Sequence, residues 1–186
     1  MIFVTKNKKG SKGFTLIETF VAITILVIAV ITPLSLLSKA IQDGNYAKNQ
    51  ITSYYLAQEA LELVINKKLQ NTANSVDWLH EMRPCVDSYC YIYWDVVTGQ
   101  DDVDIEPCDP SDESCRLSIN GQGLYVHNLS FPSSIFKRYF TLTDIIVDDG
   151  FGQEKEAKVN VYVSWNNKGT ETRAFELSGH IFNFTF

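Results

Sequence analysis

An uncharged stretch of twenty residues, from Thr19 to Ser38, limits what this chain can fold into more than any other feature. As an α-helix, which rises about 1.5 Å per residue, it would be about 30 Å long and would match the hydrocarbon core of a bilayer. The stretch therefore predicts a membrane-spanning helix. Four lysines precede it and no comparable basic cluster follows: Lys6, Lys8, Lys9 and Lys12. Because basic residues stay on the cytoplasmic side, we expect a cytoplasmic N-terminus and an exported remainder.

Two ordinary explanations for such a segment are a cleaved secretory signal and a plain single-pass anchor. A secretory signal fits poorly, because its apolar part is usually about 7 to 15 residues long and "SLLSKAIQ" offers only a poor cleavage site. A plain anchor leaves unexplained Glu18, which directly precedes the uncharged run. A carboxylate deep in a bilayer costs about 2.5 to 3.5 kcal/mol, so charged residues in spans usually have a partner or a function.

A partner for this carboxylate would arise if the chain were cut between Gly13 and Phe14, because the new amine would lie four residues before Glu18. An ammonium and a carboxylate at the edge of an apolar helix form a natural pair, within one molecule or between neighbours. The segment "KGFTLIE" resembles the processing signal of type IV pilins and pseudopilins, and the apolar continuation extends the resemblance to about Ala40.

This resemblance implies roles for particular residues. A prepilin peptidase would cut after Gly13 and methylate the new N-terminus at Phe14, and Glu18 would be the assembly carboxylate that pairs with the terminal amine of an adjacent subunit. The helix of this family is often bent at a proline two residues further from the cut than Pro33. Since proline inside a helix removes a hydrogen bond and costs about 3 kcal/mol, we expect a bend near Pro33.

Residues 46–70 keep a helical period after the membrane run. Their apolar face is expected to carry Tyr54, Ala57, Ala60, Leu61 and Val64. The other side carries Gln58, Glu59 and Glu62, which we interpret as a solvated helical face, with a metal site as the alternative. This pattern predicts an amphipathic helix that packs under a sheet. The segment "AQEALE" within it also resembles minor pilins and I-type pseudopilins.

The chain beyond Pro84 has the composition of strands and turns. Expected strands are Tyr89–Val97, Leu124–Leu129, Tyr139–Val147, Lys158–Trp165 and Thr172–Leu177, with turns at Asp148–Glu154 and Asn166–Gly169. Short runs of β-branched and aromatic residues separated by turn residues predict an antiparallel meander. Together with the helices they predict an α+β fold, in which a long N-terminal helix packs against an antiparallel sheet as in pilins.

The four cysteines all follow the apolar run: Cys85, Cys90, Cys108 and Cys115. Export favours disulfides, and the spacings lack the two-residue knuckles that are typical of zinc sites. Three pairings are possible, of which the local one joins Cys85 to Cys90 and Cys108 to Cys115. The last two cysteines lie in an acidic segment, residues 98–123, for which we expect a solvated, disulfide-braced loop. Calcium is the alternative, although Pro107 occupies the glycine position of an EF-hand loop.

Catalysis has little support in the sequence. His80, His127 and His180 are far apart and are interpreted as surface or half-buried residues, and no nucleophile elbow or phosphate-binding loop is present. The formal net charge of −6 argues against nucleic-acid binding. Aromatic residues could form a ligand-binding face, but in small sheets they usually belong to the core. We therefore expect no enzyme activity, no cofactor and no metal.

These inferences together predict a cytoplasmic leader at residues 1–13, a transmembrane and polymerisation helix at 14–40, and an exported head at 41–186 with its sheet at about 89–186. The resemblance implies a structural subunit of a type IV pilus or type II secretion filament, a minor pilin or pseudopilin rather than a major pilin. Its expected partners are prepilin peptidase, other subunits, the inner-membrane assembly platform and, before assembly, lipid. A membrane-anchored receptor or adhesin that never polymerises is the alternative, and a tethered enzyme comes third.

Overall fold

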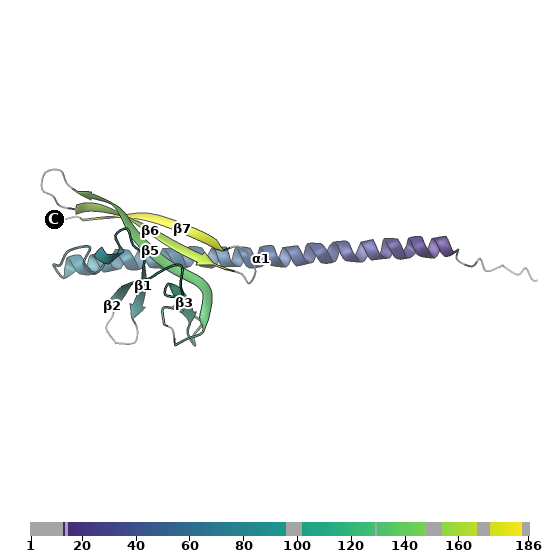
Figure 1. The fold of residues 1–186 in the computed structure, drawn as a ribbon, viewed down its shortest axis with the longest axis horizontal. Coiled ribbons are helices and arrows are strands. Elements are labelled where there is room, and N and C mark those ends of the chain that lie inside the picture. The colour runs from purple at the N-terminus through teal and green to yellow at the C-terminus, as the bar shows by residue number, and fades with distance from the viewer. Residues whose placement is uncertain are drawn as a thin grey trace, which may run out of the picture. The chain divides into compact units, whose positions relative to one another are not determined.

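The computed structural model describes residues 13, 15–95, 102–128, 130–147, 154–166 and 172–183. Contacts divide the chain into two compact units, Met1–Tyr46 and Ala47–Phe186. A single helix, α1 (Leu16–Ala73), crosses the boundary between them. In the second unit, α1 from Ala47 onward packs against a curled antiparallel sheet, and a short 3₁₀ helix, η1 (Arg83–Cys85), leads into it (Figure 1). The predicted α+β fold class is confirmed.

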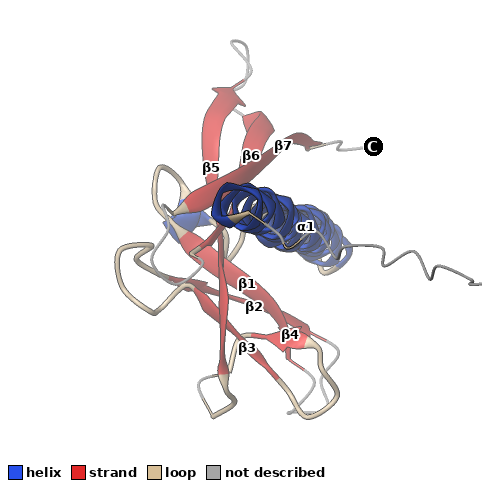
Figure 2. Ribbon diagram, turned by 90° about the vertical axis from the view of Figure 1, so that its right-hand side faces the viewer, coloured by secondary structure: helices blue, strands red, loops and turns tan. Residues whose placement is uncertain are grey.

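Seven strands form the sheet in the described residues. They are β1 (Cys90–Asp95), β2 (Asp102–Pro107), β3 (Arg116–Ile119), β4 (Tyr125–Val126), β5 (Ser133–Val147), β6 (Glu154–Trp165) and β7 (Arg173–Phe182). The order is β2-β1-β5-β3-β4, while β6 pairs with the other side of β5 and β7 pairs with β6. Figure 2 shows β5, β6 and β7 grouped on one side and β1 to β4 on the other. The long β5 therefore organises the head, because both groups pair with it.

The helix face that packs on the sheet is rotated relative to the sequence-based expectation. Its buried residues are Ser53, Leu56, Ala57, Ala60, Leu63, Val64, Lys67 and Asn71, whereas Tyr54 is exposed. Three of these side chains are polar but have partners: Ser53 Oγ donates to the Asn49 carbonyl oxygen, Lys67 Nζ pairs with Glu81, and Asn71 Nδ2 donates to two carbonyls. Polar groups that have hydrogen-bond partners can be buried at little cost. The buried face of the helix was therefore misplaced when it was assigned from apolar residues alone.

One strand packs unusually close to the helix. A Cβ atom at Gly179 in β7 would lie 3.1 Å from Leu61 Cδ1 of α1. A side chain at this position would therefore fit only if Leu61 shifted by a few tenths of an ångström. Leu61 is half-buried and packs against both this glycine and the core.

The acidic loop predicted at residues 98–123 is wrong, since it contains β2 and β3. The segment "DVDIEP" alternates acidic and apolar residues, and Val103 is buried whereas Glu106 is exposed. Leu117 in β3 is buried in the same way. The high acidic content of the segment concealed a period of two residues, which is the pattern of a strand with one solvated face.

The other expected strands are present with different limits. The structure has β1, β4, β5, β6 and β7 where five strands were predicted, and β5 begins six residues earlier than expected. The β5–β6 and β6–β7 pairs are both antiparallel, as in the predicted meander. Val96, Val97, Leu129 and the predicted turn residues 148–153 and 167–169 lie outside the described residues.

Two disulfides brace the head with the local pairing. Cys85–Cys90 joins η1 to the start of β1, and Cys108–Cys115 closes the turn between β2 and β3. Within that turn, Asp109 and Asp112 accept hydrogen bonds from the Ser111 and Ser114 amides. The carboxylate of Glu113 pairs with Arg116. In the described part of the turn these three carboxylates thus have local structural partners, the arrangement expected of a solvated, braced turn.

Candidate functional site

The first candidate site is the start of α1, where Thr15 caps the helix. The Glu18 amide donates to Thr15 Oγ1 at 3.3 Å and to the Thr15 carbonyl oxygen at 3.1 Å. Threonine followed three residues later by glutamate is the sequence signature of a capping box, although no helix start was predicted from it. Across the described residues the exposed Glu18 carboxylate has no hydrogen-bond or ion-pair partner. Its charge is therefore available to a group from another molecule or from the chain end.

The following part of α1 presents apolar side chains on every face. An 18-residue window has a mean hydropathy of 2.7, and none of it is buried. Its hydroxyl groups bond back to the helix: Thr19 to the Leu16 carbonyl, Thr24 to Phe20, Thr32 to Ile28 and Ser35 to Thr32. In hydrocarbon every polar group needs such an internal partner. This helix can span a membrane, or its surface can be covered by other apolar helices.

The remaining residues predicted around the processing site are only partly described. Gly13 is exposed, and a Cβ atom there would meet nothing within 4 Å. Phe14 and the leader residues 1–12 lie outside the described residues. Pro33 lies inside α1, which continues through it. Since proline has no amide hydrogen, the Ala29 carbonyl loses its helical donor, and the bend expected near Pro33 stays a prediction.

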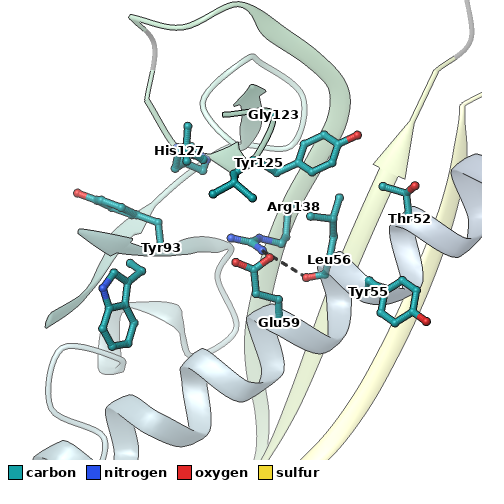
Figure 3. A pocket seen from close by; sticks show the side chains of 12 residues that line it. Thr52, Tyr55, Leu56, Glu59, Tyr93, Gly123, Tyr125, His127 and Arg138 are labelled. Carbon is teal, nitrogen blue, oxygen red and sulfur yellow. Dashed lines mark hydrogen bonds and ion pairs between the residues drawn. The ribbon is translucent and has the colours of Figure 1, made fainter. Parts of the chain in front are cut away.

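The second candidate site is a cavity of about 480 Å³ in the head. Its floor carries Arg138, a β5 residue whose side chain is only 3% exposed. Arg138 Nη1 donates to Glu59 Oε2 at 2.8 Å, and Nη2 donates to the Ile92 carbonyl oxygen at 3.1 Å. Figure 3 shows the guanidinium and the Glu59 carboxylate facing each other in the middle of the cavity lining. One side chain thus ties β5 to α1 and to β1.

The electrostatics of this pair follow from its burial. Desolvation lowers the pKa of Arg138, and the charge and hydrogen bond of Glu59 oppose this effect. Arg138 Nε is buried without a hydrogen-bond partner in the described residues. The interpretation of Glu59 as part of a purely solvated face is therefore incomplete, because its half-exposed carboxylate is the counter-ion of a buried cation.

His127 lies beside this pair in the cavity wall. Its ring stacks on Tyr91 with centroids 3.6 Å apart, and its buried Nε2 has no hydrogen-bond partner in the described residues. Burial and the positive charge of Arg138 lower the pKa of His127 to about 4, against a hydrogen bond with the Cys115 backbone that raises it. His127 is half-buried, whereas His80 and His180 are exposed, as expected from the sequence.

This pKa predicts an acid-sensitive head. Because His127 titrates at about 4 when folded and near 6.5 when unfolded, the unfolded chain binds more protons between these values. Neutral His127 therefore contributes fully to the stability of the folded state above pH 6.5, and this contribution is lost as the pH falls toward 4. We expect His127→Phe, which keeps an aromatic ring, to remove up to about 3 kcal/mol of this pH dependence.

Urea unfolding of the full chain in detergent, followed by tryptophan fluorescence at several pH values, measures this effect. His80→Phe is the matched control, because His80 is exposed and its substitution should leave the pH dependence as in the wild type. An identical pH dependence in His127→Phe and the wild type would contradict the assignment.

Comparisons with models of known protein families, with curated proteins and with solved structures found no match for this chain. The candidate roles therefore rest on the residues and their geometry. Of these residues, Glu18 and Pro33 were found from the sequence, whereas the cavity around Arg138 was not. Its only sequence signal is the alternation of β5, which places Arg138 on the same face as Phe136 and Phe140.

Proposed function

We propose that this chain is a structural subunit of an extracytoplasmic filament of the type IV pilus or type II secretion class. The observation that carries the proposal is the start of α1, where an exposed acidic side chain without a partner in the described residues precedes a helix whose apolar surface is entirely uncovered. A disulfide-braced α+β head follows the same helix. An anchor alone does not require an acid at this position, whereas an assembly contact does.

Assembly would exchange one apolar environment for another. Before polymerisation the first part of α1 lies in the inner membrane, with the N-terminus cytoplasmic and the head exported. In the filament the same surface contacts helices of neighbouring subunits. Because lipid tails are about as apolar as leucine, this exchange has little intrinsic driving force, and shape and polar pairs determine which register forms. Glu18 would supply the polar pair by binding the methylated amine of Phe14 in an adjacent subunit.

The proposed partners follow from this cycle. A prepilin peptidase cleaves between Gly13 and Phe14, an inner-membrane assembly platform extracts the subunit, and other pilin or pseudopilin subunits receive it. We propose no catalytic role. A minor subunit fits better than a major one, because the Cys108–Cys115 turn and the acidic strand β2 give the head an elaborate acidic side. The proportion of this chain in purified filaments tests that point, and a filament built mostly of this chain would reject it.

Mass spectrometry of the N-terminal peptide of the purified protein tests cleavage between Gly13 and Phe14 directly. We expect protein purified from the membrane to lack residues 1–13 and to carry a methyl group on the Phe14 amine. Gly13→Leu should retain the leader, because a side chain now stands at the scissile bond. Gly10→Leu is the matched control, since this other leader glycine lies three residues before the cut, and its processing should equal that of the wild type. Retention of residues 1–13 in the wild type would instead indicate a plain anchor.

A receptor or adhesin that is anchored by α1 and never polymerises is the second candidate. The head cavity favours it, because a lined cavity with a charged pair on its floor is typical of ligand sites. The two candidates differ in whether the chain is found in filaments. Sheared filaments that contain the processed chain support the first, and exclusive recovery in the membrane fraction supports the second.

A further inference from the structure

The walls of the head cavity come from separate segments of the Ala47–Phe186 unit. They are α1, the end of β1, the turn and strand from Gly123 to His127, and β5. The turn is held in shape by Asn120, whose Oδ1 accepts from the Gln122 and Leu124 amides at 3.0 and 2.9 Å. Gly123 in this turn has a φ of 81°, a conformation that favours glycine. This wall is therefore built by local hydrogen bonds without any ligand.

The rim of the cavity is aromatic and apolar although it faces solvent. Tyr55 is 64% exposed, Trp94 40% and Leu124 58%. Tyr93 and Tyr125 also line the cavity, on either side of the Arg138–Glu59 pair (Figure 3). Tyr55 and Trp94 are too exposed to belong to the core, which is the usual place of aromatic residues in small sheets, whereas Tyr125 packs on the core residue Phe136. They offer flat apolar faces to a ligand that enters from solvent.

The floor of the cavity is polar without carrying a net charge. The positive charge of Arg138 is balanced by Glu59 at 2.8 Å, so an anion would meet the half-exposed carboxylate and a cation would meet the guanidinium. Hydrogen-bonding capacity is nevertheless present, because the Glu59 carboxylate lines the cavity and is half-exposed, so it can accept hydrogen bonds from a ligand. A purely apolar ligand would take water from this carboxylate without replacing its hydrogen bonds, which is costly.

From these features we infer that the cavity binds an uncharged pyranose sugar. A pyranose has C–H faces that stack on aromatic rings and hydroxyl groups that both donate and accept hydrogen bonds, which suits an aromatic rim over a neutral polar floor. The cavity volume of about 480 Å³ is sufficient for one or two sugar rings. The inference rests on the proposed export of the head, where sugars are accessible, and does not depend on filament assembly.

Saturation-transfer NMR on the full chain, in a detergent without sugar headgroups, tests this inference. The probes are glucose, galactose, mannose and N-acetylglucosamine, each as the free sugar and as the methyl glycoside, with methyl glucuronide and sialic acid as charged comparators. We expect at least one neutral sugar to receive saturation on its ring C–H protons and to bind at least about tenfold more tightly than the charged sugars. Binding of methyl glycosides indicates the terminal residue of a glycan as the ligand source, and binding of the free sugar alone indicates a monosaccharide.

Aromatic variants locate the binding site. Trp94→Ala and Tyr55→Ala should each weaken binding of the neutral sugar by about tenfold or more. Tyr89→Ala is the matched control, because Tyr89 is similarly exposed, at 47%, but does not line the cavity. Tyr55 lies on the outer surface of α1, so its replacement tests the site without risk to folding. Absence of binding by every neutral sugar, tighter binding of a charged sugar, or wild-type affinity in both rim variants would overturn the inference.

Discussion

Replacing Glu18 with alanine is expected to reduce incorporation of the chain into filaments at least about tenfold while leaving its amount in the membrane unchanged. A carboxylate deep in hydrocarbon costs about 2.5 to 3.5 kcal/mol on insertion scales, so an assembly that buries Glu18 among apolar helices needs a partner for it. Pairing with an amine recovers that cost only in the register where the two groups meet. Since a tenfold change corresponds to about 1.4 kcal/mol, loss of this one contact is sufficient for the expected effect. The ratio of processed chain in sheared filaments to that in membranes measures it.

The capping box at the same position requires a control. Glu18→Gln keeps a residue that can bond back at the helix start but removes the charge, whereas Thr15→Ala weakens the cap by about 1 kcal/mol and keeps the charge. If the charge acts in assembly, Glu18→Gln should behave like Glu18→Ala and Thr15→Ala should assemble nearly as the wild type. If Glu18→Gln assembled normally and Thr15→Ala failed to assemble, Glu18 would act only through the capping box at the helix start, and its charge would have no role in assembly.

The parts of this fold that could be predicted are those where one local pattern decides the structure. The first part of α1 was evident because an uncharged run of that length has few alternatives. Strand β6 was evident because Val159, Val161 and Val163 alternate with polar residues, and all three are buried. In both segments the sequence pattern and the environment agree, so no distant contact was needed to identify them.

The parts that were missed depend on contacts between distant segments. The phase of α1 was misassigned because Ser53 and Lys67 are buried with partners that the helix sequence does not reveal. Strand β2 was missed because acidic residues occupy its solvated face. The cavity required Arg138 to meet Glu59, which lies 79 residues earlier in the chain. Local periodicity places Arg138 inward but contains no information about its counter-ion.

The pair of Arg138 and Glu59 gives the largest expected effect on stability. Glu59→Ala leaves the buried guanidinium without its counter-ion, and we expect the free energy of unfolding to fall by about 3 kcal/mol, at the lower end for broken buried pairs because Glu59 is half-exposed. Arg138→Met removes the buried charge and leaves only a carboxylate that water can reach, so its cost should be smaller. The double variant Glu59→Leu/Arg138→Met should recover most of the loss, since apolar side chains of similar volume often replace buried ion pairs without penalty.

A double-mutant cycle of Glu59→Leu, Arg138→Met and the double variant, measured by urea unfolding of the full chain in detergent, separates these contributions. Glu62→Ala provides the matched control, because this glutamate lies on the same helix, is exposed and accepts a hydrogen bond only from Gln58 in the described residues. Its effect should stay within about 0.5 kcal/mol. Additive single effects in the cycle, or a Glu59→Ala variant as stable as Glu62→Ala, would mean that the pair does not tie α1 to β5. A non-additive cycle would instead show that the ion pair on the cavity floor couples the helix energetically to the sheet.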